Sequence, residues 1–145
     1  MTTELELGLV AEFPGVFRDY GGDMTETCMH WGFAHDDGWF TLLRTYCLRV
    51  EAIRKASGVS AIASQVKEKW GRLEFYQDLV APDGMGKEER DVWFGILDAL
   101  EEQLCDDSLR TCEVCGKPGR LRYRGVWQKT VCSADAAALG FTDQE

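Results

Sequence analysis

Three cysteines in the last third of the chain have the residue type and spacing of metal ligands. Cys112 and Cys115 are separated by two residues, and Gly116 follows directly. Two thiolates at this spacing on a tight turn can point at one tetrahedral ion, and glycine supplies the backbone freedom that such a turn needs. Cys132 comes after a further sixteen residues, which is room for a short antiparallel excursion that returns to the turn. The pattern predicts a metal site, with zinc as the metal.

The fourth ligand of this site is left open by the sequence. Asp135 stands where a zinc ribbon would carry its last cysteine. Carboxylates can bind zinc, although thiolate and imidazole are the usual ligands of structural sites. Asp135 is therefore one candidate, another residue such as Cys105 or a histidine is a second, and a site with only three protein ligands is a third. The alternative to all of these is a group of buried cysteines that holds no metal.

An incomplete ligand set also raises the question of catalysis, because catalytic zinc keeps one position open for water. The acid nearest in sequence is Glu113, which lies between the first two ligands and is expected to point away from the metal. No general base is recognisable beside the cysteines. We therefore expect a structural zinc in a protein that is not an enzyme, and a zinc-dependent hydrolase is the weaker alternative.

Charge is distributed unevenly along the chain. The formal net charge is −9, but residues 110–131 carry +5 and the remainder carries −14. Arg120, Arg122 and Arg124 alternate along a predicted strand, and alternate residues of a strand share one face. They are candidate contacts for an acidic protein surface or for phosphate, although the acidic remainder repels nucleic acid at long range. A solvated face is the simpler interpretation.

Length and composition indicate a single soluble domain over residues 1–145. Hydrophobic residues make up 45% of the chain and aromatic residues 11%, which is enough for a core. No run approaches the roughly 18 apolar residues that a membrane helix needs. The first residues are acidic where a secretory signal is basic. We expect a cytoplasmic protein, in which thiols stay reduced and available to a metal.

The hydrophobic pattern divides the chain into three regions. Residues 1–36 lack a sustained period and are predicted to be irregular, residues 37–106 to form a helix–hairpin–helix core, and residues 107–139 to form the zinc-binding subregion. The predicted elements are helices at 39–56 and 87–105, strands at 60–69, 72–78, 120–124 and 126–131, and a helical turn at 134–139. This order predicts an α+β fold in which two helices pack on a small antiparallel β-sheet, followed by a zinc-ribbon-like knuckle.

The central hairpin carries a second candidate surface. Its turn is predicted at Trp70 and Gly71, with Lys67 and Lys69 just before it. Strands that alternate charged and aromatic residues can bind a partner. Lys67, Lys69 and Trp70 are therefore candidate partner-binding residues, and a sheet with one solvated face is the alternative.

Four motifs, in the same order, resemble a family of small uncharacterised proteins encoded by bacteriophages and prophages. They are Asp-Gly-Trp-Phe from residue 37, Val-Lys-Glu-Lys-Trp-Gly from residue 66, Cys-Glu-x-Cys-Gly-x-Pro-Gly from residue 112, and Trp-x-x-Thr-x-Cys from residue 127. In this family a histidine typically follows the last cysteine three positions on. The resemblance thus implies a zinc site with four ligands, in which this chain has Asp135 in place of the histidine. The family offers no established activity to transfer.

The resemblance and the small acidic chain imply an accessory protein of a phage or prophage that acts by binding a host or phage protein. An inhibitor of host machinery, such as an anti-CRISPR-like factor, would fit this class. A nucleic-acid-binding zinc module that uses residues 120–124 is the second hypothesis, and the zinc-dependent hydrolase is the third.

Overall fold

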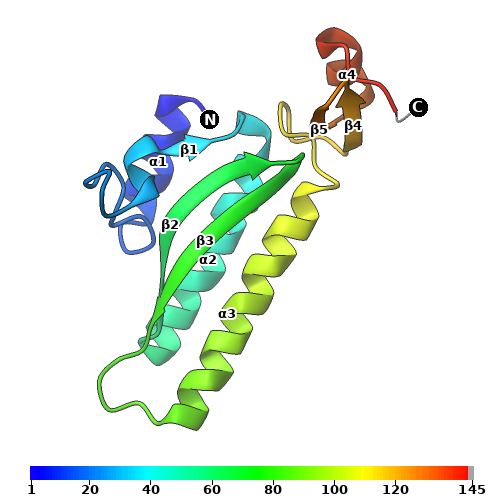
Figure 1. The fold of residues 1–145 in the computed structure, drawn as a ribbon. Helices are drawn as coiled ribbons and strands as arrows, with labels where there is room; N and C mark the ends of the chain where they lie inside the picture. Colours follow the sequence, from blue (N-terminus) through cyan, green and yellow to red (C-terminus); the bar gives the residue numbers. More distant parts are fainter. Residues whose placement is uncertain (144–145) are drawn as a thin grey trace.

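The computed structural model describes residues 1–143 and has an α+β fold (Figure 1). Helices α2 and α3 lie side by side along one three-stranded sheet, and these elements form the body of the molecule. A small unit of β4, β5 and α4 lies at one end of the body. The elements, in chain order, are α1 (Thr3–Glu12), η1 (Cys28–Trp31), β1 (Phe33–Ala34), η2 (Asp37–Trp39), α2 (Phe40–Ser57), β2 (Ser60–Lys69), β3 (Arg72–Val80), α3 (Lys87–Ser108), β4 (Arg120–Arg124), β5 (Trp127–Val131) and α4 (Ser133–Leu139).

Helix α2 forms because its apolar residues recur at helical spacing. Leu43, Tyr46, Cys47 and Val50 are buried, which places them three or four positions apart on one face. The helix ends at Gly58, whose left-handed conformation closes the last turn through a hydrogen bond to Arg54 O. Helix α3 also buries apolar residues at helical spacing, namely Leu97, Leu104 and Cys105. Both predicted helices are confirmed, and α3 extends three residues beyond its predicted end.

The hairpin of β2 and β3 is the long element of the sheet. Its strands pair antiparallel from Ser60 opposite Val80 to Lys69 opposite Arg72, so the predicted turn at residues 70 and 71 is confirmed. A bulge after Ala63 shifts the register by one residue and keeps apolar side chains of both strand halves on the core face. The sheet is mixed and not wholly antiparallel as predicted, because the two-residue strand β1 pairs parallel with β2.

The prediction of an irregular segment over residues 1–36 is wrong for its first part, which forms α1. Only Leu9 of this helix is fully buried, so it carries no hydrophobic period. Polar contacts attach it instead: Glu6 accepts hydrogen bonds from Tyr20 Oη at 2.8 Å and from the Phe33 amide at 3.1 Å. With α1 and α4, the described chain has four α-helices where two and a helical turn were predicted.

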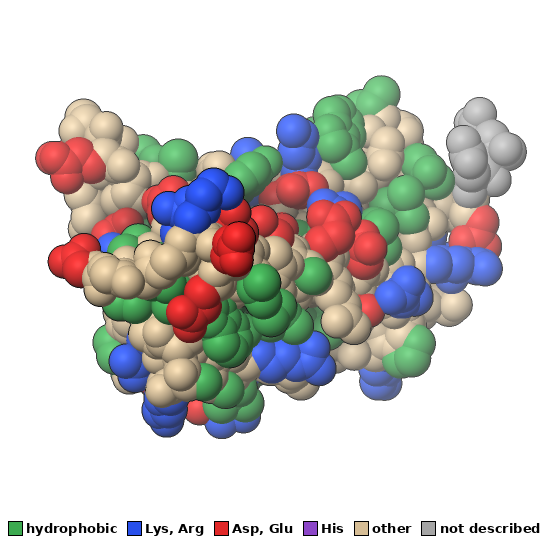
Figure 2. Space-filling model, turned by 90° about the horizontal axis from the view of Figure 1, so that it is seen from below, with side chains coloured by type: hydrophobic (Ala, Val, Ile, Leu, Met, Phe, Trp, Pro, Cys, Tyr) green, Lys and Arg blue, Asp and Glu red, His purple; other side chains and the backbone are tan. Residues whose placement is uncertain are grey.

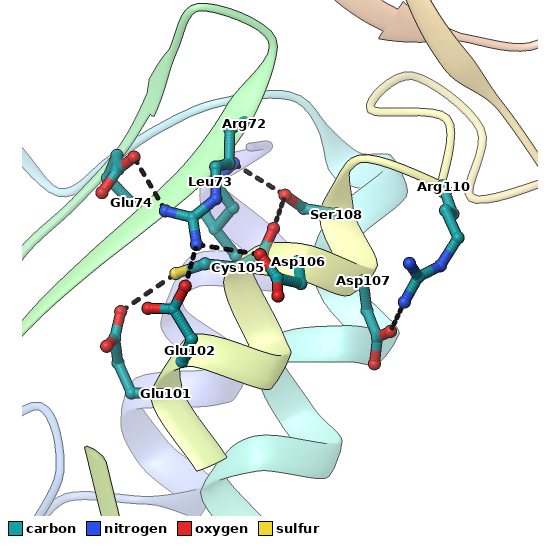
Figure 3. A network of polar contacts seen from close by, with 10 residues as sticks. All are labelled: Arg72, Leu73, Glu74, Glu101, Glu102, Cys105, Asp106, Asp107, Ser108 and Arg110. Atoms are coloured by element: carbon teal, nitrogen blue, oxygen red, sulfur yellow. Dashed lines mark hydrogen bonds and ion pairs between the residues drawn. The ribbon is translucent and has the colours of Figure 1, made fainter. Parts of the chain in front are cut away.

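Arg72, the first residue of β3, attaches the hairpin to the end of α3 (Figure 3). The adjacent Leu73 amide donates to Ser108 Oγ at 2.8 Å, and Ser108 is fully buried. Burial alone would lower the pKa of Arg72, but hydrogen bonds to acids raise it, so the guanidinium stays charged. This network fixes the hairpin against the residues from which the metal-binding subregion begins. The guanidinium pairs with three acids at 3.1 to 3.2 Å, namely Glu74, Glu102 and Asp106.

The outer surface of this body is mixed in charge. In Figure 2, which views the molecule from below Figure 1, acidic and basic side chains are interspersed and hydrophobic side chains are exposed between them. Scattered exposed hydrophobic residues are normal on a folded domain and mark no site by themselves. Within residues 1–143, no helix has both the length and the apolar character that crossing a membrane requires.

Candidate metal centre

The four predicted ligands lie together at the base of the small C-terminal unit. One ligand atom from each of Cys112, Cys115, Cys132 and Asp135 lies within 4.8 Å of all the others. Asp135 Oδ2 is 3.1 Å from Cys112 Sγ and 3.2 Å from Cys132 Sγ, and the Cys115 and Cys132 sulfurs are 3.7 Å apart. A tetrahedral zinc with Zn–S bonds of about 2.3 Å separates two thiolates by roughly 3.8 Å. The arrangement therefore has the dimensions of a single metal site.

Two local structures bring the ligands together. The Cys112–Cys115 turn is closed by hydrogen bonds from Gly116 N to Cys112 O at 2.9 Å and from Cys112 N to Lys117 O at 2.7 Å. Gly116 has a φ of 76°, which a side chain would resist. The β4–β5 hairpin then returns the chain to this turn. Cys132 caps the N-terminus of α4, and its sulfur accepts a hydrogen bond from the Asp135 amide, which holds Asp135 beside it.

The donor set suits zinc. Three thiolates and one carboxylate form a closed four-coordinate set, and soft sulfur ligands favour zinc over magnesium or calcium. Hydrogen bonding to Asp135 raises the pKa of Cys115 to about 12 and in turn lowers the pKa of Asp135. A metal that binds here must displace the thiol protons, so binding is coupled to proton release. Cys105, the other cysteine considered as a ligand, lies in the body and contacts Glu101 at 3.0 Å.

Glu113 is buried, and its carboxylate is used outside the ligand cluster. Only 2% of the residue is exposed; Oε1 accepts from the Asp36 amide at 3.2 Å, and Oε2 lies 2.9 Å from Lys129 Nζ. Burial raises the pKa of Glu113, and the Lys129 ammonium partly offsets this. Burial would lower the pKa of Lys129, but its bonds to Glu113 and Asp36 raise it overall. The Glu113 carboxylate is committed to this contact with Lys129 and to the Asp36 amide, so it is not free to act as a base at the ligand cluster.

The cysteine turn packs directly on the start of α2. Gly38 N donates to Glu113 O at 2.6 Å, and a side chain at Gly38 would approach Cys112 O to 2.1 Å. The fully buried Trp39 donates from Nε1 to Thr111 O at 2.9 Å. The motif Asp-Gly-Trp that precedes α2 thus forms the surface on which the cysteine turn packs. Sequence reasoning used this motif as a helix start and as part of the family resemblance, and it did not predict this contact, which joins residues 72 positions apart.

The three arginines of β4 are engaged within the chain. Arg120 and Arg122 both pair with Asp143, and Arg122 also donates to Ser133 Oγ at 3.1 Å. The Arg124 guanidinium lies 4.9 Å from the centre of the Phe141 ring and donates to Leu139 O at 2.8 Å. Arg120 and Arg122 share Asp143, which agrees with their predicted position on one strand face, whereas Arg124 has partners of its own. Their partners Ser133, Phe141 and Asp143 were missed by sequence reasoning, which had no signal for the return of the C-terminal segment to β4.

The hairpin candidates lie near the junction between the body and the small unit. Trp70 is 64% exposed and Lys69 is exposed, whereas the Lys67 ammonium lies 5.6 Å from the centre of the Tyr76 ring. Trp70 has a φ of 55° and is the one non-glycine residue with positive φ in the described part of the chain. The next residue, Gly71, approaches Leu121 so closely that a Cβ would lie 2.3 Å from it.

Two further exposed hydrophobic residues lie at the turn of the β4–β5 hairpin. Val126 is 84% exposed and Trp127 is 68% exposed. Trp127 lines an open groove of about 310 Å³ together with Glu68 of β2 and Lys129 of β5. Trp127 therefore lies at a groove that β5 shares with the end of β2.

No protein-family model, curated protein or solved structure matches this chain. The resemblance to phage proteins therefore stays a prediction.

Proposed function

We propose that this is a non-enzymatic, zinc-stabilised protein that acts by binding another protein. The observation that carries the proposal is the cluster of Cys112, Cys115, Cys132 and Asp135, whose ligand atoms lie within 4.8 Å of one another. Zinc in this cluster would join the turn after α3 to the start of α4. Because the same turn packs on Gly38 and Trp39, the ion would also hold the small unit against the body.

Several features favour a structural over a catalytic ion. Three cysteines and an aspartate complete a tetrahedral set and leave no position for water, whereas catalytic zinc keeps one open. Glu113 is paired with Lys129 at 2.9 Å and cannot serve as a general base. The proposal therefore sets the zinc-dependent hydrolase aside.

The hairpin tip is the surface that we assign to partner binding. Type I′ hairpin turns favour Asn-Gly, and a bulky residue at positive φ costs on the order of 1 kcal/mol. Trp70 occupies such a position with 64% of its surface exposed. An exposed indole kept at a strained position is better explained by contact with a partner than by stability of the free chain.

Protein binding is favoured over nucleic-acid binding because the chain outside residues 110–131 carries −14 and repels a long polyanion, and because the arginines of β4 are paired in the free chain. Arg120 and Arg122 share Asp143, and Arg124 covers Phe141, so the +5 segment offers few free cations to phosphate. The proposed setting is the bacterial cytoplasm, with a host or phage protein as partner and inhibition of host defence as the outcome. That setting is supported by the sequence resemblance alone.

The test combines metal analysis with a matched pair of tryptophan variants. Purified chain should contain about one zinc, and tagged chain should retain a partner from a bacterial lysate. Trp70→Asn places the preferred residue in the turn, so it should keep or raise the melting temperature while abolishing partner retention. Trp31→Ala, which removes another exposed indole (69% exposed) from η1, should retain the partner.

Zinc-free protein that melts unchanged would refute the structural role of the metal. Equal retention by wild type and the Trp70→Asn variant would refute the assignment of the hairpin tip. Retention that disappears on nuclease treatment would favour the nucleic-acid hypothesis instead.

A further inference from the structure

We propose that Arg120, Arg122 and Ser133 form a carboxylate-binding site for an acidic segment of a protein partner, and that Asp143 occupies this site in the free chain. The inference deepens the proposed function, because it names the chemistry of a partner and a device that regulates access to it. It concerns a surface of the small unit that is separate from the hairpin tip.

Arg122 is the buried centre of this site. Its side chain is only 10% exposed, and its terminal nitrogens lie 3.1 Å from Asp143 Oδ1 and 3.1 Å from Ser133 Oγ. Its Nε is buried and has no hydrogen-bond partner among residues 1–143. A guanidinium at this depth requires an anion beside it, since an unpaired buried charge is strongly unfavourable. Arg122 is therefore the centre of a cationic site, and Asp143 is the acid that occupies it.

The second cation is held on the same side of the strand. Arg120 is two residues before Arg122 on β4 and pairs with the other carboxylate oxygen, Oδ2, of Asp143. One carboxylate thus bridges two guanidinium groups, which is a strong mode of carboxylate recognition. An open groove of about 330 Å³ adjoins them, lined also by Pro118, Gly119 and Val131, and gives an incoming side chain access.

The segment that carries Asp143 is anchored by the two residues that precede it, Phe141 and Thr142. Phe141 is 8% exposed and packs with Cys112, Val131 and Ala136, so it belongs to the core of the small unit. Thr142 then forms two backbone hydrogen bonds with Tyr123, both of 2.8 Å. Within residues 1–143, Asp143 is held by its ion pairs alone, and its side chain is 55% exposed. The carboxylate can therefore leave the site without removing Phe141 from the core.

The resident group also indicates what the ligand is. The acid that fills the site is a carboxylate from an extended segment paired to the outer edge of β4, which is how many proteins bind peptides. The rest of the chain carries −14, which repels nucleic acid more strongly than a short acidic peptide. An aspartate or glutamate in an extended segment of a partner is thus the ligand that the site fits.

The experiment compares zinc-loaded full-length wild type with Asp143→Asn, using a short fluorescein-labelled oligoglutamate peptide and fluorescence anisotropy at low salt. Removing the resident charge should tighten peptide binding about five- to tenfold, because the Asp143 carboxylate, which is 55% exposed, then no longer competes with the peptide through its two ion pairs. Asp143→Glu keeps the carboxylate and should bind the peptide as weakly as wild type. Adding Arg120→Gln to Asp143→Asn should cancel the gain, and this arginine is exposed enough for the variant to fold.

Peptide binding that is equal in wild type and Asp143→Asn would overturn the inference. Tighter binding of labelled single-stranded DNA than of the peptide by Asp143→Asn would also overturn it, in favour of a phosphate site. Zinc content and melting temperature are measured on each sample. A sample with full zinc and no peptide binding refutes this site alone, whereas samples that hold no zinc refute the proposed function.

Discussion

Replacing Lys129 with Met should strongly destabilise the junction between the small unit and the body. The substitution keeps the length of the side chain but leaves the carboxylate of Glu113, which is 2% exposed, without its counter-ion at 2.9 Å. Breaking a buried ion pair by removing one partner costs about 3 to 5 kcal/mol. The second partner of the ammonium, Asp36, is 53% exposed and contributes much less.

Urea unfolding of zinc-saturated protein measures this loss, and a double-mutant cycle separates the ion pair from packing. Glu113→Gln with Lys129→Met removes both charges, and the amide oxygen can still accept from the Asp36 amide. The double variant should recover most of the lost free energy of unfolding. A Lys129→Met variant within about 0.5 kcal/mol of wild type would refute the claim that this pair is buried and joins the two parts.

Three further predictions follow from other contacts. Cys115→Ser should lose zinc and expose the amides of residues 107–139 to hydrogen exchange, with several kcal/mol of stability lost; unchanged exchange would refute a structural metal. Burial lowers the pKa of His35 from 6.5 to about 4. As the pH is lowered from 6.5 to 4, the unfolded chain therefore takes up a proton that the folded chain does not, and the free energy of unfolding should fall by up to about 3 kcal/mol. His35→Gln should reduce that pH dependence in urea titrations, and an unchanged slope would refute the assignment. Ser108→Ala leaves the buried Leu73 amide without its acceptor and should cost about 1 to 3 kcal/mol in thermal unfolding, whereas a neutral effect would show that another acceptor replaces it.

The elements that could be predicted from sequence are those that bury a periodic face. Leu43, Cys47 and Val50 mark α2 because a helix places them on one stripe, and α2 forms there. The hairpin strand β2 was predicted at its observed bounds, Ser60–Lys69. The metal ligands were recognisable because their chemistry requires particular residue types at particular spacings, and the structure brings all four into one cluster.

The elements that could not be predicted depend on contacts distant in sequence. Helix α1 buries little beyond Leu9, and its position is set by what Glu6 and Glu12 contact elsewhere, including Arg44 at 2.6 Å. Strand β1 has two residues and exists only because Phe33 pairs with Val66 of β2. Local propensity carries no information about either, since tertiary contacts decide both.

The contact between Trp39 and Thr111 also has a consequence for how the protein is made. Thr111 lies 72 positions after the tryptophan whose indole it receives. A ribosome that adds about 5 to 20 residues per second needs roughly 4 to 14 seconds to extend the chain over that distance. Through that interval the Trp39 indole lacks the carbonyl that accepts its hydrogen bond in the folded chain. This contact therefore closes only after Thr111 has been made, and a metal ion can act only from the point at which Cys112, Cys115 and Cys132 have also been made.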